Sequence, residues 1–128
     1  MAAKPKPTAA ELAILQILWQ RGPSTVRDIH NDWDKDSPVG YTTVLKLLQI
    51  MTDKGLVERD ETARAHVYKA TSDREQTQGH LVRDLVDRVF GGSAAQLVLR
   101  ALSERKTSAR EIAEIRDMLD TFEKGKRK

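Results

Sequence analysis

Few residues of this 128-residue chain could catalyse a reaction or hold a metal ion. Asp32-x-Asp34-x-Asp36 matches the acidic start of a calcium-binding loop, but Ser37 and Thr43 stand where that loop needs a glycine and a bidentate glutamate. We interpret these aspartates as solvated turn residues. The three histidines stand singly, without a second ligand at metal-site spacing, and we expect them to be surface or core residues: His30, His66 and His80.

The sequence predicts neither enzymatic activity nor a cofactor. It contains no cysteine, which excludes disulfides, thiolate metal sites and cysteine catalysis, and which fits a reducing cytoplasm. It also has no glycine-rich phosphate-binding loop and no Gly-x-Ser-x-Gly nucleophile turn. A binding function is therefore favoured over catalysis.

Composition predicts a folded, soluble chain with one modest domain or two small, mutually dependent ones. Charged residues make up 32% and apolar residues 39% of the chain. The longest nearly apolar run, residues 12–19, is far short of the ~20 residues of a membrane span. A secretory signal needs an apolar segment after its charged N-terminal residues, and no such segment follows the charges here. We expect a cytoplasmic protein with no membrane insertion.

Hydroxyl, amide and basic side chains gather in the middle of the chain. The net charge of +3 is small, so nucleic-acid binding must depend on where the charges lie. Residues 37–52 contain no acidic residue and one lysine. Threonine can contact phosphate or the thymine methyl group, glutamine can pair with adenine, and lysine with guanine. The candidate DNA-binding residues are Tyr41, Thr42, Thr43, Lys46, Gln49 and Arg64.

Three helices and a hairpin are expected to position these residues. A capping box at Thr8 begins a helix over about residues 9–20, and Ser24 or Thr25 caps a shorter second helix. The third runs from near Tyr41 to Lys54 and ends at a glycine. Strands at residues 56–59 and 65–70 form a hairpin whose polar tip carries Arg64. This order is typical of a winged helix-turn-helix.

The expected third helix has an apolar face and a polar face. At ~100° per residue, one arc holds Val44, Leu47, Leu48 and Met51, and the opposite side holds Thr42, Lys46, Gln49 and Asp53. The major groove, ~12 Å wide, accepts one helix whose N-terminal residues reach base edges. The polar face therefore predicts DNA contact.

The same residues also have structural interpretations. Thr42 and Thr43 could cap the helix. Lys46 and Gln49 could belong to a solvated face, and Tyr41 could be a core residue with a wet hydroxyl. The order of the elements, the acid-free segment and the basic hairpin tip together favour DNA binding. A winged helix that docks another protein stays open as an alternative.

After residue 71 the pattern becomes purely helical. We expect a winged helix-turn-helix domain over residues 1–71, a three-helix dimerisation domain over 72–124 and a basic tail over 125–128, so the fold class is mainly α with a small β-wing. Ser72, Ser93 and Ser108 stand where these three helices begin, Ser72 in a capping box with Glu75. The candidate dimerisation residues are Leu81, Leu85, Val89, Leu97, Ile112, Ile115, Leu119 and Phe122.

These apolar stripes could pack within one chain or against a second copy. A segment of ~55 residues buries little surface alone. A dimer is favoured, because a single winged helix reads a half-site too short to find in a genome, and two copies roughly square the selectivity. Twofold symmetry then predicts a palindromic operator with half-sites ~10 base pairs, or a multiple of that, apart.

The segment from Tyr41 to Val57, with Tyr-Thr-Thr-Val at its start and Lys-Gly-Leu-Val at its end, resembles the penicillinase repressor family (BlaI/MecI type, with the CopY repressors as cousins). The similarity extends over residues 11–19, 25–29 and 64–68, and over Gly91-Gly92 with the helical stretch after it. The resemblance implies an N-terminal winged helix, a C-terminal dimerisation domain, and repression by a dimer on a dyad-symmetric DNA operator.

In antibiotic-responsive members of that family, a membrane-bound sensor protease triggers cleavage of the repressor at an Asn-Phe bond. The resemblance therefore implies such a protease as a partner, but Arg100-Ala101 stands at the aligned position, so the cleavage motif is not matched. The copper-responsive members use a C-terminal cysteine cluster, which this chain lacks. The inducing signal is left open.

Overall fold

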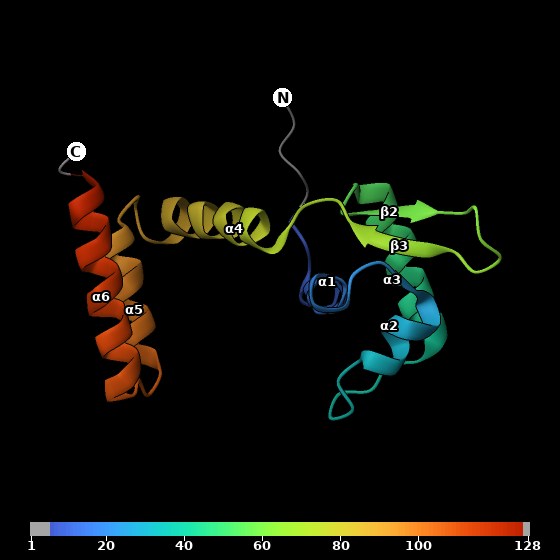
Figure 1. Cartoon of the computed structure of the whole chain (residues 1–128), viewed down its shortest axis with the longest axis horizontal. Coiled ribbons are helices and arrows are strands. Elements are labelled where there is room, and N and C mark those ends of the chain that lie inside the picture. Colours follow the sequence, from blue (N-terminus) through green and yellow to red (C-terminus); the bar gives the residue numbers. More distant parts are fainter. Residues whose placement is uncertain (1–5, 127–128) are drawn as a thin grey trace. The chain divides into compact units, whose positions relative to one another are not determined.

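A computed structural model describes residues 6–126 (Figure 1). Over these residues the elements are α1 (Ala9–Arg21), β1 (Ser24–Thr25), α2 (Val26–Asp32), α3 (Tyr41–Lys54), β2 (Val57–Asp60), β3 (Val67–Ala70), α4 (Arg74–Val89), α5 (Ala94–Glu104) and α6 (Ala109–Lys126). The chain divides into two compact units, residues 1–82 and 83–128, and the division falls within α4. The mainly helical class with a small β-wing is confirmed.

Reciprocal caps begin the first two helices. The Thr8 hydroxyl accepts a hydrogen bond from the Glu11 amide at 3.2 Å, and the Glu11 carboxylate accepts one from the Thr8 amide at 2.9 Å. Thr25 and Asp28 form the same arrangement at α2. Each satisfies amides that a helix start leaves without partners. The start of α1 is confirmed, and Thr25 rather than Ser24 caps α2.

The wing is a three-stranded antiparallel sheet in the order β1-β3-β2. The hairpin β2–β3 was expected, and in Figure 1 its tip projects away from the helices of the same unit. The third strand, β1, was not expected, because two residues are too few to show the alternation of apolar and polar side chains that indicates a strand. In it, Ser24 pairs with Tyr68 and Thr25 with Val67.

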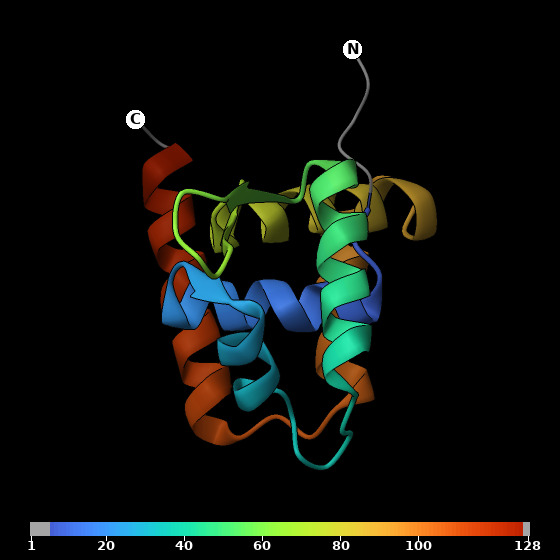
Figure 2. The same ribbon diagram turned by 90° about the vertical axis from the view of Figure 1, so that its right-hand side faces the viewer.

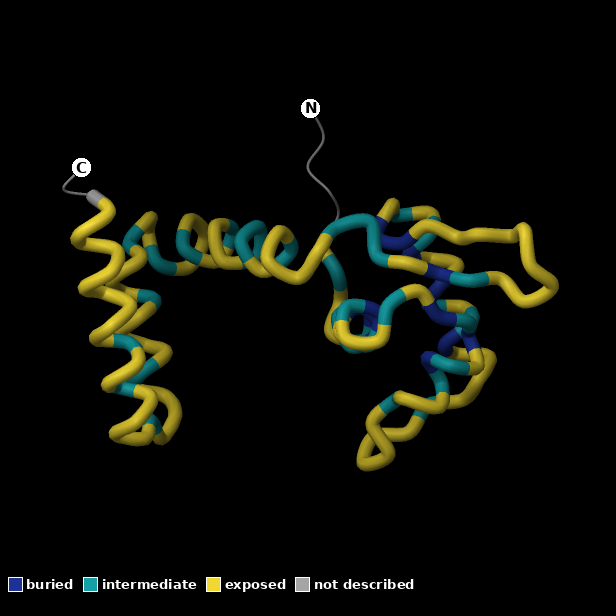
Figure 3. The backbone as a smooth tube through the Cα atoms, in the orientation of Figure 1, coloured by how far each residue is buried: buried dark blue, intermediate teal, exposed yellow. Residues whose placement is uncertain are grey.

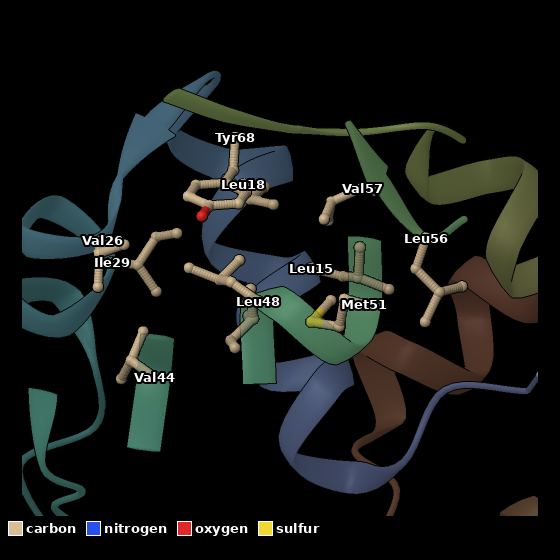
Figure 4. Close-up of a cluster of buried hydrophobic side chains, with 11 residues drawn as sticks. Leu15, Leu18, Val26, Ile29, Val44, Leu48, Met51, Leu56, Val57 and Tyr68 are labelled. Carbon is tan, nitrogen blue, oxygen red and sulfur yellow. The ribbon is translucent and has the colours of Figure 1, made fainter. Parts of the chain in front are cut away.

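The core lies between α1, α2, α3 and the sheet. Figure 2 shows α1 crossing α3, and Figure 4 shows side chains from both helices meeting those of the strands. Of the apolar arc predicted on α3, Val44, Leu48 and Met51 are buried and Leu47 is half-buried. The helix ends at Gly55, whose φ of +80° is the left-handed conformation that glycine adopts without strain.

The C-terminal helices begin and end close to the expected positions, with two differences. At α4 the reciprocal hydrogen bonds join Asp73 and Gln76, so the capping box predicted at Ser72 and Glu75 was wrong by one residue. The Asp73 carboxylate reaches an amide three residues on, as the Ser72 hydroxyl was expected to do. At the other end α6 continues to Lys126, into the segment expected as a basic tail, whose last two residues lie outside the described part.

No described residue after Tyr68 is buried, as Figure 3 shows by the absence of dark blue from α4, α5 and α6. Figure 2 shows α5 and α6 standing apart rather than packed along their lengths. Large apolar side chains of these helices are exposed, among them Val89 (64%), Leu119 (60%) and Phe122 (71%). The three helices bury no core of their own in a single chain.

Candidate nucleic-acid interface

The outward face of α3 carries polar side chains that the rest of the chain does not use. Thr42, Thr43, Lys46 and Gln49 are all exposed, on the side opposite the buried arc. Among the described residues, none of the four side chains has a hydrogen bond or ion pair. The acidic member of this face, Asp53, lies near the C-terminal end of the helix. The N-terminal half therefore offers free donors and one cation without an opposing carboxylate.

The N-terminus of α3 is not capped by a side chain. The N-cap residue is Gly40, whose carbonyl accepts from the amides of Thr43 at 3.1 Å and Val44 at 3.2 Å. The interpretation of Thr42 and Thr43 as capping residues was therefore wrong, because both lie inside the first turn, after the N-cap position. A helix start also carries partial positive charge, which favours an approaching phosphate.

Tyr41 lies at the edge of this face. Its side chain is 45% exposed, so its interpretation as a core residue was wrong. The ring meets the His30 ring edge-on, with centroids 6.0 Å apart. His30 lies 3.0 Å from the Val39 carbonyl through Nε2, which holds the histidine against the segment leading into α3. Two elements thus position the Tyr41 ring beside the N-terminus of α3.

The basic residues of the winged helix fall into two groups. Four of the eight between residues 8 and 72 form ion pairs: Arg21, Lys54, Arg59 and Lys69. The other four have no carboxylate partner among the described residues: Arg27, Lys35, Lys46 and Arg64. The unpaired group lies on α2, the α2–α3 connection, α3 and the hairpin tip. Lys46 therefore lies on the exposed face of α3 itself, and Arg27 and Arg64 both lie close to Tyr41 and Leu45 of that helix.

Arg27 and Lys35 were missed as candidate residues. Ion pairing decides which basic side chains are available to a nucleic acid, and it depends on side chains distant in the sequence. Arg21 shows why. It reaches from α1 to Asp28 at 3.1 Å and Asp32 at 3.0 Å, so it neutralises carboxylates of α2 and leaves Arg27 unpaired.

Asp28 is held as a carboxylate by its surroundings. The amide of Thr25 donates to it, the Thr25 hydroxyl forms a second hydrogen bond, and the charge of Arg21 adds to both, which lowers the pKa of Asp28. Asp28 therefore stays ionised. Its carboxylate binds Thr25 in the cap of α2 and Arg21 on α1.

The aspartates and histidines considered as metal ligands in the sequence do not form a metal site in the described residues. Asp32 is the last residue of α2 and pairs with Arg21, so it is not a turn residue. Asp34 and Asp36 lie in the turn after α2, where the amide of Asp36 donates to Asp34 at 2.9 Å. Over residues 6–126 no three histidine, aspartate or glutamate side chains gather as a metal site would require. None of the helices described there is long and apolar enough to cross a membrane.

Comparison with known proteins identifies the family. Residues 7–121 match the model of the penicillinase repressor family. The chain belongs to the penicillinase repressor family. A transcriptional regulator BlaI from Mycobacterium tuberculosis is 31% identical over 116 residues, which cover 90% of this chain and 83% of that protein. The resemblance carried by residues 41–57 is confirmed.

More distant relatives in the penicillinase repressor family match over nearly their whole length. A penicillinase repressor from Staphylococcus aureus is 21% identical over 90% of this chain and 91% of its own. The methicillin resistance regulatory protein MecI from the same species is 20% identical over 88% of this chain and 92% of its own. The match spans both units of the chain, so the family assignment covers the winged helix and the C-terminal helices together.

Proposed function

We propose that this chain is a transcriptional repressor that binds a dyad-symmetric DNA operator as a homodimer. The outward face of α3 carries the proposal, because its exposed polar side chains have no partner within the described chain and unpaired cations lie on it or close to its helix. Membership in a family whose relatives are named as repressors supports the same function. Such a protein acts at the chromosome, so we place it in the cytoplasm.

The residues have separate roles in this proposal. Thr42, Thr43, Lys46 and Gln49 enter the major groove, where they can meet base edges. Tyr41, at the start of α3, and Arg64, at the tip of the wing, contact the DNA backbone or the adjacent groove. Phosphate contacts supply affinity that falls with salt, and the base contacts supply the choice of sequence. The proposal includes no catalytic step and no cofactor.

Dimerisation is proposed through α4, α5 and α6. The candidate residues on these helices are half-buried or exposed in one chain: Leu81, Leu85, Val89, Leu97, Ile112, Ile115, Leu119 and Phe122. Val98, Leu99 and Met118 on the same helices are exposed as well. Burying apolar surface stabilises by about 25 cal/mol per Å². A second copy of the chain can supply the surface that the three helices lack, whereas packing within one chain leaves these side chains in water.

A mobility-shift assay with DNA from upstream of the chain's own gene tests the proposal. A repressor of this kind shifts the DNA, protects a palindrome in a footprint and binds much more weakly at the higher of two salt concentrations. The absence of any shift at low salt would favour the alternative, a winged helix that docks another protein. The two outcomes separate the two classes of function.

A sensor protease stays a prediction from the family. Arg100 and Ala101, at the position aligned with the cleaved bond, lie within α5 and are exposed. Incubation of the repressor with membranes from induced cells tests this, followed by mass spectrometry of any fragments. Cleavage beside Arg100 would support a protease partner, and an intact chain under relieved repression would argue against one.

A further inference from the structure

A pocket of about 440 Å³ lies between α2, α3 and the wing. Its lining includes Arg27 from α2, Tyr41 from the start of α3, and Arg64 and His66 from the wing, all of them exposed. No acidic residue belongs to the lining. Donors from three separate elements therefore surround one space without a carboxylate among them.

Sheet pairing explains why these residues meet. In the antiparallel pair β1–β3, Thr25 stands opposite Val67. The chain after Thr25 and the chain before Val67 therefore leave the sheet on the same side. Arg27 follows Thr25 by two residues, and His66 and Arg64 precede Val67. The short β1 strand thus carries the first turn of α2 to the wing.

The charges of the pocket are not balanced within the chain. Arg27 and Arg64 both lack an ion-pair partner among the described residues. The nearest acid along α2, Asp28, is engaged by Thr25 and Arg21. Two guanidinium groups beside one pocket repel each other, and an anion between them removes that repulsion. Guanidinium groups also match the geometry of phosphate oxygens.

We infer that this pocket binds a backbone phosphate of the operator and that Arg27 and His66 contact the DNA in addition to Arg64 and Tyr41. The inference rests on the proposed function, because it needs α3 in the major groove. Tyr41 and Leu45 of α3 line the pocket, so a duplex seated on the outward face of that helix passes beside it. Phosphates border each groove of DNA, and about half or more of protein–DNA hydrogen bonds go to the phosphate oxygens and sugars.

Titrations of labelled operator DNA at several salt concentrations test the inference, with circular dichroism to check folding. Arg27→Ala should weaken binding to all sequences alike and reduce the slope of log affinity against log salt by about 1. His66→Ala should also weaken binding uniformly, because it removes a ring donor. The control is Arg110→Ala, which removes the same charge from a side chain that is 91% exposed on α6. The control should leave the slope unchanged.

Replacing single operator phosphates by neutral methylphosphonates locates the contact. One replacement should weaken binding of the unchanged protein and have no further effect on Arg27→Ala. Two results would contradict a phosphate contact at this pocket while leaving the repressor function intact. One is an equal loss of affinity for both proteins at every methylphosphonate position. The other is a slope of log affinity against log salt that is the same for Arg27→Ala and Arg110→Ala. If the unchanged protein binds no DNA at low salt, the proposed function itself fails.

Discussion

Lys54, the last residue of α3, donates hydrogen bonds to both carboxylate oxygens of Glu11 on α1, at 2.9 and 3.0 Å. The Glu11 side chain is only 2% exposed and also accepts a hydrogen bond from the Thr8 amide. One carboxylate thus joins the cap of α1 to the end of α3, 43 residues away. The pair fixes the helix proposed to enter DNA against the helix behind it.

Removing the lysine should destabilise the winged helix. Lys54→Ala leaves a buried acceptor without its charged partner, which costs about 1–3 kcal/mol. The matched control is Lys69→Ala, whose partner Glu58 is exposed, as is Lys69 itself, so its loss should cost about 0–1 kcal/mol. Urea denaturation gives both values. Equal free energies of unfolding for the two variants would show that the buried Lys54–Glu11 pair stabilises the fold no more than the exposed Lys69–Glu58 pair does.

Acid should weaken the same contact. Burial raises the pKa of Glu11, but the hydrogen bond from the Thr8 amide, those from Lys54 and the Thr8 hydroxyl, and the charge of Lys54 together outweigh it and lower the pKa. A lowered pKa in the folded state contributes stability above the unfolded value of about 4.3, and this is lost as pH falls through the folded value.

Comparison with Glu11→Gln isolates this contribution, because glutamine keeps the size and does not titrate. The difference in free energy of unfolding between the original chain and the variant should be largest near neutral pH. It should shrink as the pH falls below about 4. A difference that stays constant down to acid pH would contradict the role of the ionised carboxylate.

Lys46 should contribute directly to operator binding. Lys46→Ala should lower the affinity by about 1–3 kcal/mol and relax the base preference at one position if the lysine reads a base. Titration of operator DNA and of single-base variants measures both effects, with Arg110→Ala as the control for lost charge. Unchanged affinity would remove Lys46 from the interface and leave it as a solvated residue.

Leu119 should hold the dimer together. Leu119→Asp places a charge where the proposed interface buries a leucine that is 60% exposed in one chain, so the variant should be monomeric. The control is Thr121→Asp, on the other side of α6, which should remain dimeric. Sedimentation velocity distinguishes the two. A dimer of Leu119→Asp would move the interface to α4 or α5.

Features that depend on neighbours along the chain are predictable from the order of the amino acids. The capping box at Thr8, the glycine after Lys54 and the periods of the apolar residues are local signals, because a helix satisfies its own backbone within a few residues. They located most helix ends within one or two residues. The family likewise followed from a continuous run, residues 41–57.

Side-chain partnership required the folded molecule. Nothing near Lys54 in the sequence indicates that it reaches Glu11, and nothing near Thr25 indicates that it pairs with Val67. The same long-range contacts separate the cations that are neutralised, such as Arg21, from those left available, such as Arg27. Pairing is set by distance in space, and that distance exists only once helices and strands have packed together.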